Sequence, residues 1–334
     1  MIPYASNLFR FIAIFLLLTT NFSQAKSDEN KHNQLIVLFH GFANNVASLK
    51  TIQTKLEQAF PCATVVALAN VEKMQSLNLS IQEQVEVSFK ELNQKVADLG
   101  NKSIVFIGHS QGGVRAYALL KQYAHLLQVK GLVTLATPWE GSPGGRVNEK
   151  MLLEHLTDPV LNDLRMLSLS LGYPADTLTE QLKLEIKNHQ SILHFPGAKD
   201  LLVDSTFLCE IKKTLPHTKV PILAIGGGQD DFRALVPKKI PHSFKALNSM
   251  YTWLIVGEAK CNRSHDMYIP LYSQLALNIV PKNKKNFKRI FIKDVFHSRK
   301  VWTIVTVPPY RNILSNPRVL HAIIKFTKKA LTQI

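Results

Sequence analysis

A short apolar run, I-V-F-I at residues 104–107, breaks at a glycine and passes through a serine into a helical apolar pattern. A continuous run of this kind is typical of a strand buried on both faces. Between strand and helix, Gly108-His109-Ser110-Gln111-Gly112 has the form G-x-S-x-G, in which a serine occupies a strained turn and the glycines permit a close approach of the two elements. The pattern predicts Ser110 as a nucleophile, with a helix-capping serine as the alternative.

Strand-like runs alternate with helical patterns along most of the chain. We expect strands at residues 35–39, 64–68, 103–107, 129–136, 221–225 and 287–295, and helices at 45–59, 80–99 and 316–331. Such alternation predicts an α/β fold with a mostly parallel central sheet and helices on both faces. The segment Y-T-W-L-I-V at 251–256 also has the composition of a strand.

The chain of 334 residues is long enough for one large domain with insertions. In residues 1–25, Arg10 precedes the apolar run 11–18, and small residues end at Ala25, which is the layout of a secretory signal peptide. We therefore expect export to the periplasm or the extracellular space, with residues 26–334 as the mature domain. The leucine-rich stretch from about 140 to 195 predicts a helical cap or lid inserted in that domain, although ordinary outer-layer helices would give a similar pattern.

Charge and cysteine content limit the partners. The formal net charge is +16, so anionic surfaces are attracted, among them a membrane. The densest basic run, residues 282–289, contains a single aromatic residue, which argues against specific nucleic-acid binding. Cys62, Cys209 and Cys261 lack metal-ligand spacing, so no metal site is expected, and a disulfide among them stays open.

A serine nucleophile needs donors for the oxyanion that forms when it attacks a carbonyl group. The strand at 35–39 ends on His40-Gly41-Phe42, and the backbone N–H after such a turn can point at the oxyanion. We therefore predict the backbone N–H groups of Phe42 and Gln111 as the oxyanion hole. The glycine run at 226–228 lacks the features of a nucleotide-binding loop, and no organic cofactor is expected.

The chain resembles the α/β-hydrolase superfamily over residues 34–332, and within it the lipases and the GPI-inositol-deacylase-like hydrolases. The resemblance rests on the His40 turn, on the serine turn followed by Gly113, and on three weaker motifs, which are Thr137-Pro138 with Gly141-Ser142, Asp266-Met267-Tyr268-Ile269-Pro270, and His297-Ser298. It implies the chain order Ser, Asp, His for a catalytic triad.

This resemblance implies Asp266 as the acid, in an Asp-x-x-Val-Pro-like turn with Ile269 in place of valine, and His297 as the base. Asp230 or Asp231, each after a strand and a glycine turn, is the alternative acid, and a pairing of either with His265 stays open. His321 lies among apolar neighbours of the last predicted helix, which favours a structural role. His109 is expected to pack beneath the serine turn.

The sequence therefore predicts an exported serine hydrolase that cleaves carboxylic esters, above all lipid esters, without metal or cofactor. Amide, thioester or polyester hydrolysis by the same residues is one alternative. A catalytically silent hydrolase fold used for binding is another, and a basic protein that binds nucleic acid or acidic glycans is a third.

Overall fold

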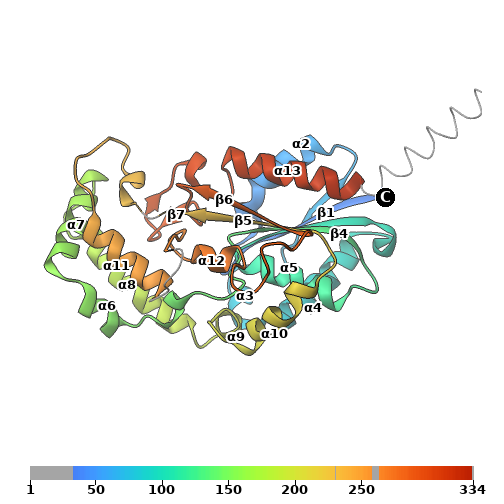
Figure 1. The fold of residues 1–334 in the computed structure, drawn as a ribbon, viewed down its shortest axis with the longest axis horizontal. Coiled ribbons are helices and arrows are strands. Elements are labelled where there is room, and N and C mark those ends of the chain that lie inside the picture. The colour runs from blue at the N-terminus through green and yellow to red at the C-terminus, as the bar shows by residue number, and fades with distance from the viewer. Residues whose placement is uncertain (1–32, 230, 258–262, 333–334) are drawn as a thin grey trace, which may run out of the picture.

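The computed structural model describes residues 33–229, 231–257 and 263–332 (Figure 1). Its central sheet has the strand order β2-β1-β3-β4-β5-β6, and every neighbouring pair is parallel. The strands are β1 (Gln34–Phe39), β2 (Thr64–Ala67), β3 (Ser103–His109), β4 (Gln128–Leu135), β5 (Ile222–Gly228) and β6 (Phe287–Lys293). All six were expected from the sequence, with bounds that differ by a few residues.

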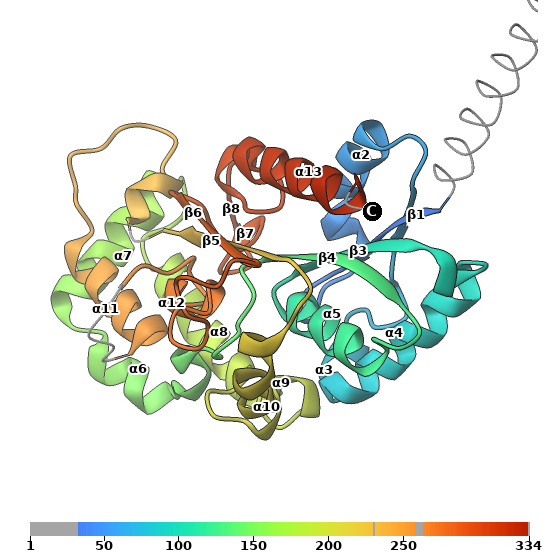
Figure 2. The ribbon, with the colours of Figure 1, turned by 45° about the vertical axis from the view of Figure 1, so that its right-hand side comes forward.

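Helices follow the strands on both sides of the sheet (Figures 1 and 2). They are α2 (Lys50–Ala59), α3 (Gln75–Asn78), α4 (Ile81–Lys95), α5 (Gln111–Gln122), α6 (Glu149–His155), α7 (Asp158–Ser170), α8 (Thr177–Ile192), α9 (Pro196–Lys199), α10 (Thr206–Thr214), α11 (Lys245–Val256), α12 (Leu271–Gln274) and α13 (Pro317–Thr332). Two short strands, β7 (Lys300–Val301) and β8 (Val305–Thr306), form a separate antiparallel pair. Among the described residues, no helix is long and apolar enough to cross a membrane.

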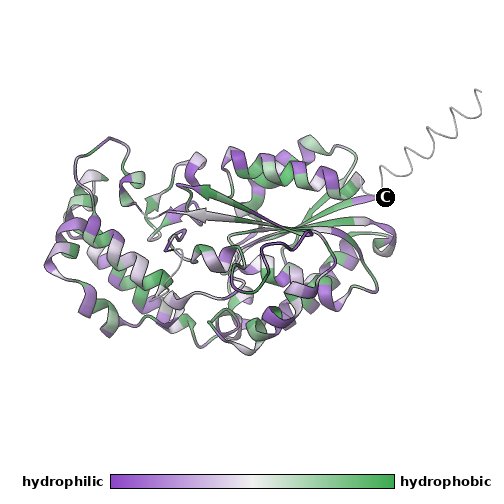
Figure 3. Ribbon diagram, in the orientation of Figure 1, coloured by the Kyte–Doolittle hydropathy of each residue, from purple (hydrophilic) through white to green (hydrophobic). Residues whose placement is uncertain are grey.

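Successive residues of the buried strands point to opposite faces of the sheet and build two cores. In β1, Leu35 and Val37 pack on the face covered by α4 and α5, while Ile36 and Leu38 pack on the face covered by α2 and α13. Figure 3 shows the strands as mainly hydrophobic and the helices as mixed. The predicted fold class, an α/β fold with a mostly parallel central sheet and helices on both faces, is confirmed.

A further hydrophobic cluster lies beyond the edge of the sheet at which β5 and β6 end (Figures 1 and 2). It joins α7, α8 and α11 to Phe296 and Trp302, which follow β6. The expectation of a strand at 251–256 is wrong, because these residues belong to α11. Leu247, Met250 and Leu254 recur at the helical spacing of three to four residues and are buried in this cluster.

Candidate active site

The strand order of the sheet brings together the turn after β1, which contains Gly41, and the turn after β3, which contains Ser110. Strand β1 lies between β2 and β3. After β1 the chain forms β2 on one side of it, and β3 is then added on the other side, so the direction in which strands are added reverses at β1. In parallel α/β sheets, ligands bind outside the carboxyl ends of the strands at such a reversal. The turn after β1 contains Gly41, and a Cβ added there would lie 3.0 Å from the Ser110 Cβ.

Ser110 joins β3 to α5 with a backbone that serine rarely adopts. Its φ is 54° and its ψ is −127°. Two hydrogen bonds hold this turn, from the Ser110 N–H to the Leu135 carbonyl at 2.8 Å and from the Gly113 N–H to the Ser110 carbonyl at 2.9 Å. Non-glycine residues with positive φ are strained by about 1–2 kcal/mol, and such strain clusters at functional sites.

The glycines of the turn permit contacts that no side chain would leave room for. A Cβ on Gly108 would lie 2.4 Å from the carbonyl oxygen of Gly112, and a Cβ on Gly112 would lie 2.4 Å from the carbonyl oxygen of Phe39. Because these neighbours are backbone atoms, they cannot rotate away. The helix α5 therefore packs directly against β1 and β3, and Ser110 is presented above the sheet edge.

Asp266 and His297 form a buried pair at the same edge. The Asp266 Oδ2 accepts a hydrogen bond from the His297 Nδ1 at 2.7 Å, and the side chain of Asp266 is fully buried. The Asp266 Oδ1 accepts from the backbone N–H groups of Tyr268 at 3.1 Å and Ile269 at 2.8 Å. The carboxylate can only accept a hydrogen bond, so the Nδ1 of His297 must carry a proton. In the neutral ring the Nε2 atom is then the one that can accept a proton.

His109 links this pair to the serine turn. Its ring lies 4.8 Å from the His297 ring, and its Nε2 donates to the His297 carbonyl oxygen at 3.0 Å. Burial, and secondarily the neighbouring His297, holds the pKa of His109 well below its ordinary value. His109 is therefore neutral, and it brings the loop of His297 next to Ser110, its own neighbour in the chain.

The orientation of the Phe42 N–H follows from the side chain of His40. Its Nδ1 donates to the Gly41 carbonyl at 2.9 Å, and the Asn44 N–H donates to the same oxygen at 3.3 Å. In a planar trans peptide the N–H points opposite to the carbonyl. The N–H of Phe42 therefore points away from His40. Burial, and secondarily the cationic Arg115, lowers the pKa of His40 to about 4, which keeps the ring neutral.

Gln111 is the first residue of α5, so its N–H has no acceptor within the helix. Its side-chain amide donates to the carbonyl oxygens of Ser76 at 3.2 Å and Gly197 at 3.1 Å. These two hydrogen bonds fix the Gln111 side chain, and its backbone N–H lies in the serine turn at the start of α5. Phe42 and Gln111 lie on the two turns that the sheet reversal places side by side.

The alternative acids are placed differently. Asp231 caps a short 3-10 helix at Phe232–Leu235 and forms a salt bridge with Arg233, with both oxygens of Asp231 engaged. Asp230 lies outside the described residues. His265 accepts a hydrogen bond from the Met267 N–H at its Nδ1 and lies 3.4 Å from the Thr252 hydroxyl through its Nε2. His321 lies on an exposed position of α13.

Two polar residues at this edge carry no local sequence signal. Gln274 exchanges hydrogen bonds with the backbone of Gly227, at 2.8 and 3.0 Å, and donates to the Ile269 carbonyl at 2.7 Å. It thereby fixes the Asp266 turn to the end of β5. Ser76 is a comparable buried residue near the Phe42 turn. Their partners lie far away in the sequence or on other elements, so no motif indicates either residue.

Metal ligands do not gather in the part of the chain that the structure describes, where no group of three or more His, Cys, Asp or Glu could hold an ion. Cys62 is exposed and Cys209 is half-buried, and both are free thiols. Cys261 lies outside the described residues. The groups that the structure describes at this end of the sheet are a serine, a histidine, an aspartate and backbone N–H groups, which are the kinds of group that acyl transfer uses.

Comparison with known proteins gives distant similarities. A family model described as palmitoyl protein thioesterase matches residues 35–170. Among solved structures, a lipase from Bacillus licheniformis is 11% identical, with 89% of this chain and 92% of that chain covered and a TM-score of 0.48. A monoacylglycerol lipase from Paleococcus ferrophilus is 12% identical, with 90% and 95% covered and a TM-score of 0.45. No curated protein sequence matches the chain.

Proposed function

We propose that the chain is a serine hydrolase of the α/β-hydrolase type that cleaves carboxylic esters, with lipid esters as its main substrates; the parallel sheet and the strained serine turn support the proposal. Ser110 is the nucleophile, His297 the base and Asp266 the acid. The observation that carries the proposal is the buried 2.7 Å hydrogen bond between Asp266 and His297, at the sheet edge where the strained turn presents Ser110.

The reaction proceeds by acyl transfer. His297 Nε2 takes the proton of the Ser110 hydroxyl as its oxygen attacks the carbonyl carbon of the ester. The N–H groups of Phe42 and Gln111 stabilise the negative charge on the carbonyl oxygen, and His297 returns the proton to the departing alcohol. A water molecule, deprotonated by His297, then attacks the acyl-enzyme. The bond between the acyl carbon and the Ser110 oxygen breaks, the acid departs, and His297 returns the proton to the Ser110 oxygen.

Apolar side chains beside the base support a lipid acyl group. The ring of Tyr268 lies 5.4 Å from the ring of His297, and Met267 and Phe296 connect this edge to the cluster built from α7, α8 and α11. We propose that the helices of residues 140–195, with α11, form a cap over an acyl-binding site. Such sites are lined mostly by apolar and aromatic groups.

Thioester hydrolysis is the second candidate, favoured by the family-model match over residues 35–170. The same triad cleaves both bonds, since the attacked carbon and the oxyanion are alike. The test compares turnover of p-nitrophenyl esters and acyl thioesters from short to long acyl chains. A preference for long-chain esters supports hydrolysis of lipid esters, and a preference for thioesters supports the second candidate. A protein inactive on both, and unlabelled by a fluorophosphonate, would leave only a binding role.

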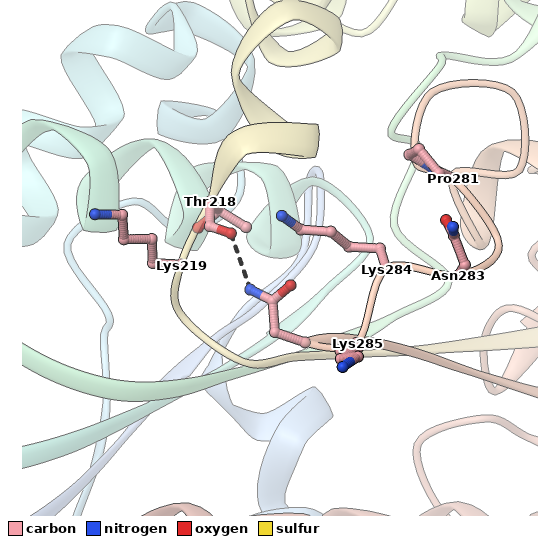
Figure 4. Close-up of a pocket in the computed structure, with 7 residues that line it drawn as sticks. Thr218, Lys219, Pro281, Asn283, Lys284 and Lys285 are labelled. Atoms are coloured by element: carbon pink, nitrogen blue, oxygen red, sulfur yellow. Dashed lines mark hydrogen bonds between the residues drawn. The ribbon is translucent and has the colours of Figure 1, made fainter.

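The proposal includes export and contact with anionic membranes. The predicted signal peptide of residues 1–25 lies outside the described residues. A hollow of about 520 Å³ at the starts of β5 and β6 is lined by Lys219, Lys284 and Lys285 and by no acidic residue (Figure 4). Asn286 fixes its walls by donating to the Thr218 carbonyl at 2.9 Å. We call these three lysines the basic patch, and we propose that it contacts anionic headgroups.

A further inference from the structure

Ser76 lies in α3, is fully buried and joins segments that are far apart in the sequence. Its hydroxyl accepts a hydrogen bond from the Ala43 N–H at 2.8 Å and donates to the Lys73 carbonyl at 2.7 Å. Its carbonyl oxygen accepts from the side-chain amides of Gln111 at 3.2 Å and Gln84 at 3.0 Å. One buried residue therefore contacts both segments that supply the proposed oxyanion donors.

The hydroxyl of Ser76 holds a strained turn. Ala43 has a φ of 52°, a left-handed conformation that costs a non-glycine residue about 1–2 kcal/mol. Its N–H belongs to the peptide that follows Phe42, and the hydrogen bond from that N–H to Ser76 fixes the plane of this peptide. The preceding peptide is fixed at the Gly41 carbonyl by His40. Both peptides that flank the Phe42 Cα are thus oriented, and with them the Phe42 N–H.

Two further hydrogen bonds join the same segments, from the Lys73 N–H to the Asn44 carbonyl at 2.8 Å and from the Val46 N–H to a Glu72 carboxylate oxygen at 2.7 Å. These bonds tie the segment before α3 to the loop after β1. Of these bonds between the two segments, the one to Ser76 is the one that acts on the peptide between Phe42 and Ala43. The hydroxyl of Ser76 is therefore the contact whose loss bears most directly on the donor.

The carbonyl of Ser76 acts on the second donor. By accepting from the Gln111 side chain, it helps to hold the first turn of α5, whose backbone N–H is the other proposed donor. The Gln111 amide also donates to the Gly197 carbonyl, and a Cβ on Gly197 would lie 2.2 Å from the Ser76 oxygen. The segment that follows the proposed cap is thus packed against Ser76.

We propose that Ser76 is a positioning residue for the oxyanion hole, which orients the Phe42 N–H through its hydroxyl and helps to hold the turn of Gln111 through its carbonyl. The inference rests on the proposed serine-hydrolase function. An oxyanion hole stabilises charge that develops only in the transition state, so misplaced donors lower kcat and leave substrate binding nearly unchanged. A residue that merely fills the core would change the folded fraction instead.

The test compares Ser76→Ala with Ser88→Ala. Ser88 in α4 is also fully buried, and its hydroxyl has no hydrogen-bond partner in the described structure, so its replacement removes the same atom without removing a hydrogen bond. Titration of active sites with a fluorophosphonate corrects each rate for the folded fraction, and thermal unfolding records stability. A boronic acid, which forms a tetrahedral adduct with a nucleophilic serine, probes the oxyanion hole at equilibrium.

For Ser76→Ala we expect a fall in kcat per titrated site of about tenfold, less than the about 100-fold loss from deleting a donor outright. The affinity for the boronic acid should fall by a similar factor, while KM changes by less than about twofold. Ser76→Cys, which keeps a weak donor and acceptor, should lie between wild type and alanine. Ser88→Ala should match wild type in kcat and boronate affinity.

The outcomes separate the two proposals. A wild-type protein that neither hydrolyses esters or thioesters nor reacts with the fluorophosphonate would overturn the proposed function itself. An active wild type, with kcat per site and boronate affinity unchanged in Ser76→Ala, would overturn the positioning role and leave the hydrolase standing. A parallel fall of Ser76→Ala and Ser88→Ala would assign the effect to core packing, and would also overturn it.

Discussion

The carboxylate of Asp266 divides its two oxygens between two tasks. Oδ1 accepts from two backbone N–H groups of its own turn, and Oδ2 accepts from His297. An amide in this position would keep its oxygen toward the backbone donors and present its NH₂ group to His297. The imidazole would then carry its proton on Nε2, where it cannot accept the proton of Ser110.

We therefore expect Asp266→Asn to lower kcat by about four orders of magnitude with little change in folding. Asp231→Asn should keep activity within about twofold, because Asp231 pairs with Arg233. The measurement is kcat/KM on a p-nitrophenyl ester, with thermal unfolding as a check on the fold. Loss of activity in Asp231→Asn together with an active Asp266→Asn would show that the triad acid is Asp231, in the turn after β5, and not Asp266.

His40 makes stability depend on pH. Its folded pKa of about 4 lies below the ordinary 6.5, so between these values the unfolded chain binds more protons than the folded one. Stability is complete above pH 6.5 and is lost as the pH falls toward 4, by up to about 3 kcal/mol from this residue. His40→Gln should weaken this dependence in urea unfolding at pH 4.5 and 7.

A matched control for this experiment is His125→Gln, since His125 is exposed. It should keep the full loss of stability between pH 7 and pH 4.5. Buried His109, whose pKa is also held low, adds to the same trend in both variants. An unchanged pH dependence in His40→Gln would show that His40 is not neutral in the folded protein.

At the scale of elements, the strands and the serine turn could be predicted because their signals are local. A buried strand is a short apolar run, and G-x-S-x-G marks one turn. The order Ser, Asp, His, which the resemblance implies, also predicts which residues form the proposed triad. Ser76 and Gln274 could not be predicted, since each acts through partners that only tertiary packing brings near.

The segment at 251–256 shows a second limit. Its β-branched and aromatic residues favour a strand, but in the structure they form the end of α11. As a helix, this segment and the turns before it bury Leu247 and Leu254 against the cluster around α7. Tertiary packing therefore decided between two states that the local composition left nearly balanced.

Direct packing of α5 on the sheet predicts a large effect at Gly112. A Cβ there would lie 2.4 Å from the Phe39 carbonyl oxygen and 2.5 Å from that of His40. We expect Gly112→Ala to lower the free energy of unfolding by about 3 kcal/mol or more, because helix and strand must separate. Gly100→Ala is the control, since its Cβ would meet only an ordinary contact at 3.4 Å. Denaturant unfolding measures both, and equal midpoints would contradict direct packing.

For the whole molecule, charge and active site occupy different places. The basic patch of Lys219, Lys284 and Lys285 lies where β5 and β6 begin, whereas Ser110 lies where β3 ends. The strands are parallel, so the patch lies at their amino ends and Ser110 at their carboxyl ends, on opposite sides of the sheet. A membrane bound at the patch would therefore contact the molecule on the side away from Ser110. Binding to an anionic surface and turnover of an ester should then be separable.

Replacing all three lysines of the patch by glutamine should weaken binding to vesicles that contain phosphatidylserine by tenfold or more, since each lysine near such a surface contributes about 1 kcal/mol. The control replaces Lys325, Lys328 and Lys329, which are exposed on α13, and removes the same charge elsewhere. If net charge alone attracted the membrane, both triple variants would lose equal affinity.

Turnover of a water-soluble ester should be unchanged in both triple variants. The affinity of the wild type for the vesicles should fall steeply with added salt because exposed charges are screened. Equal loss in the two variants would contradict a role specific to the patch, whereas loss confined to the first would place the contact at the edge of the sheet opposite the catalytic residues.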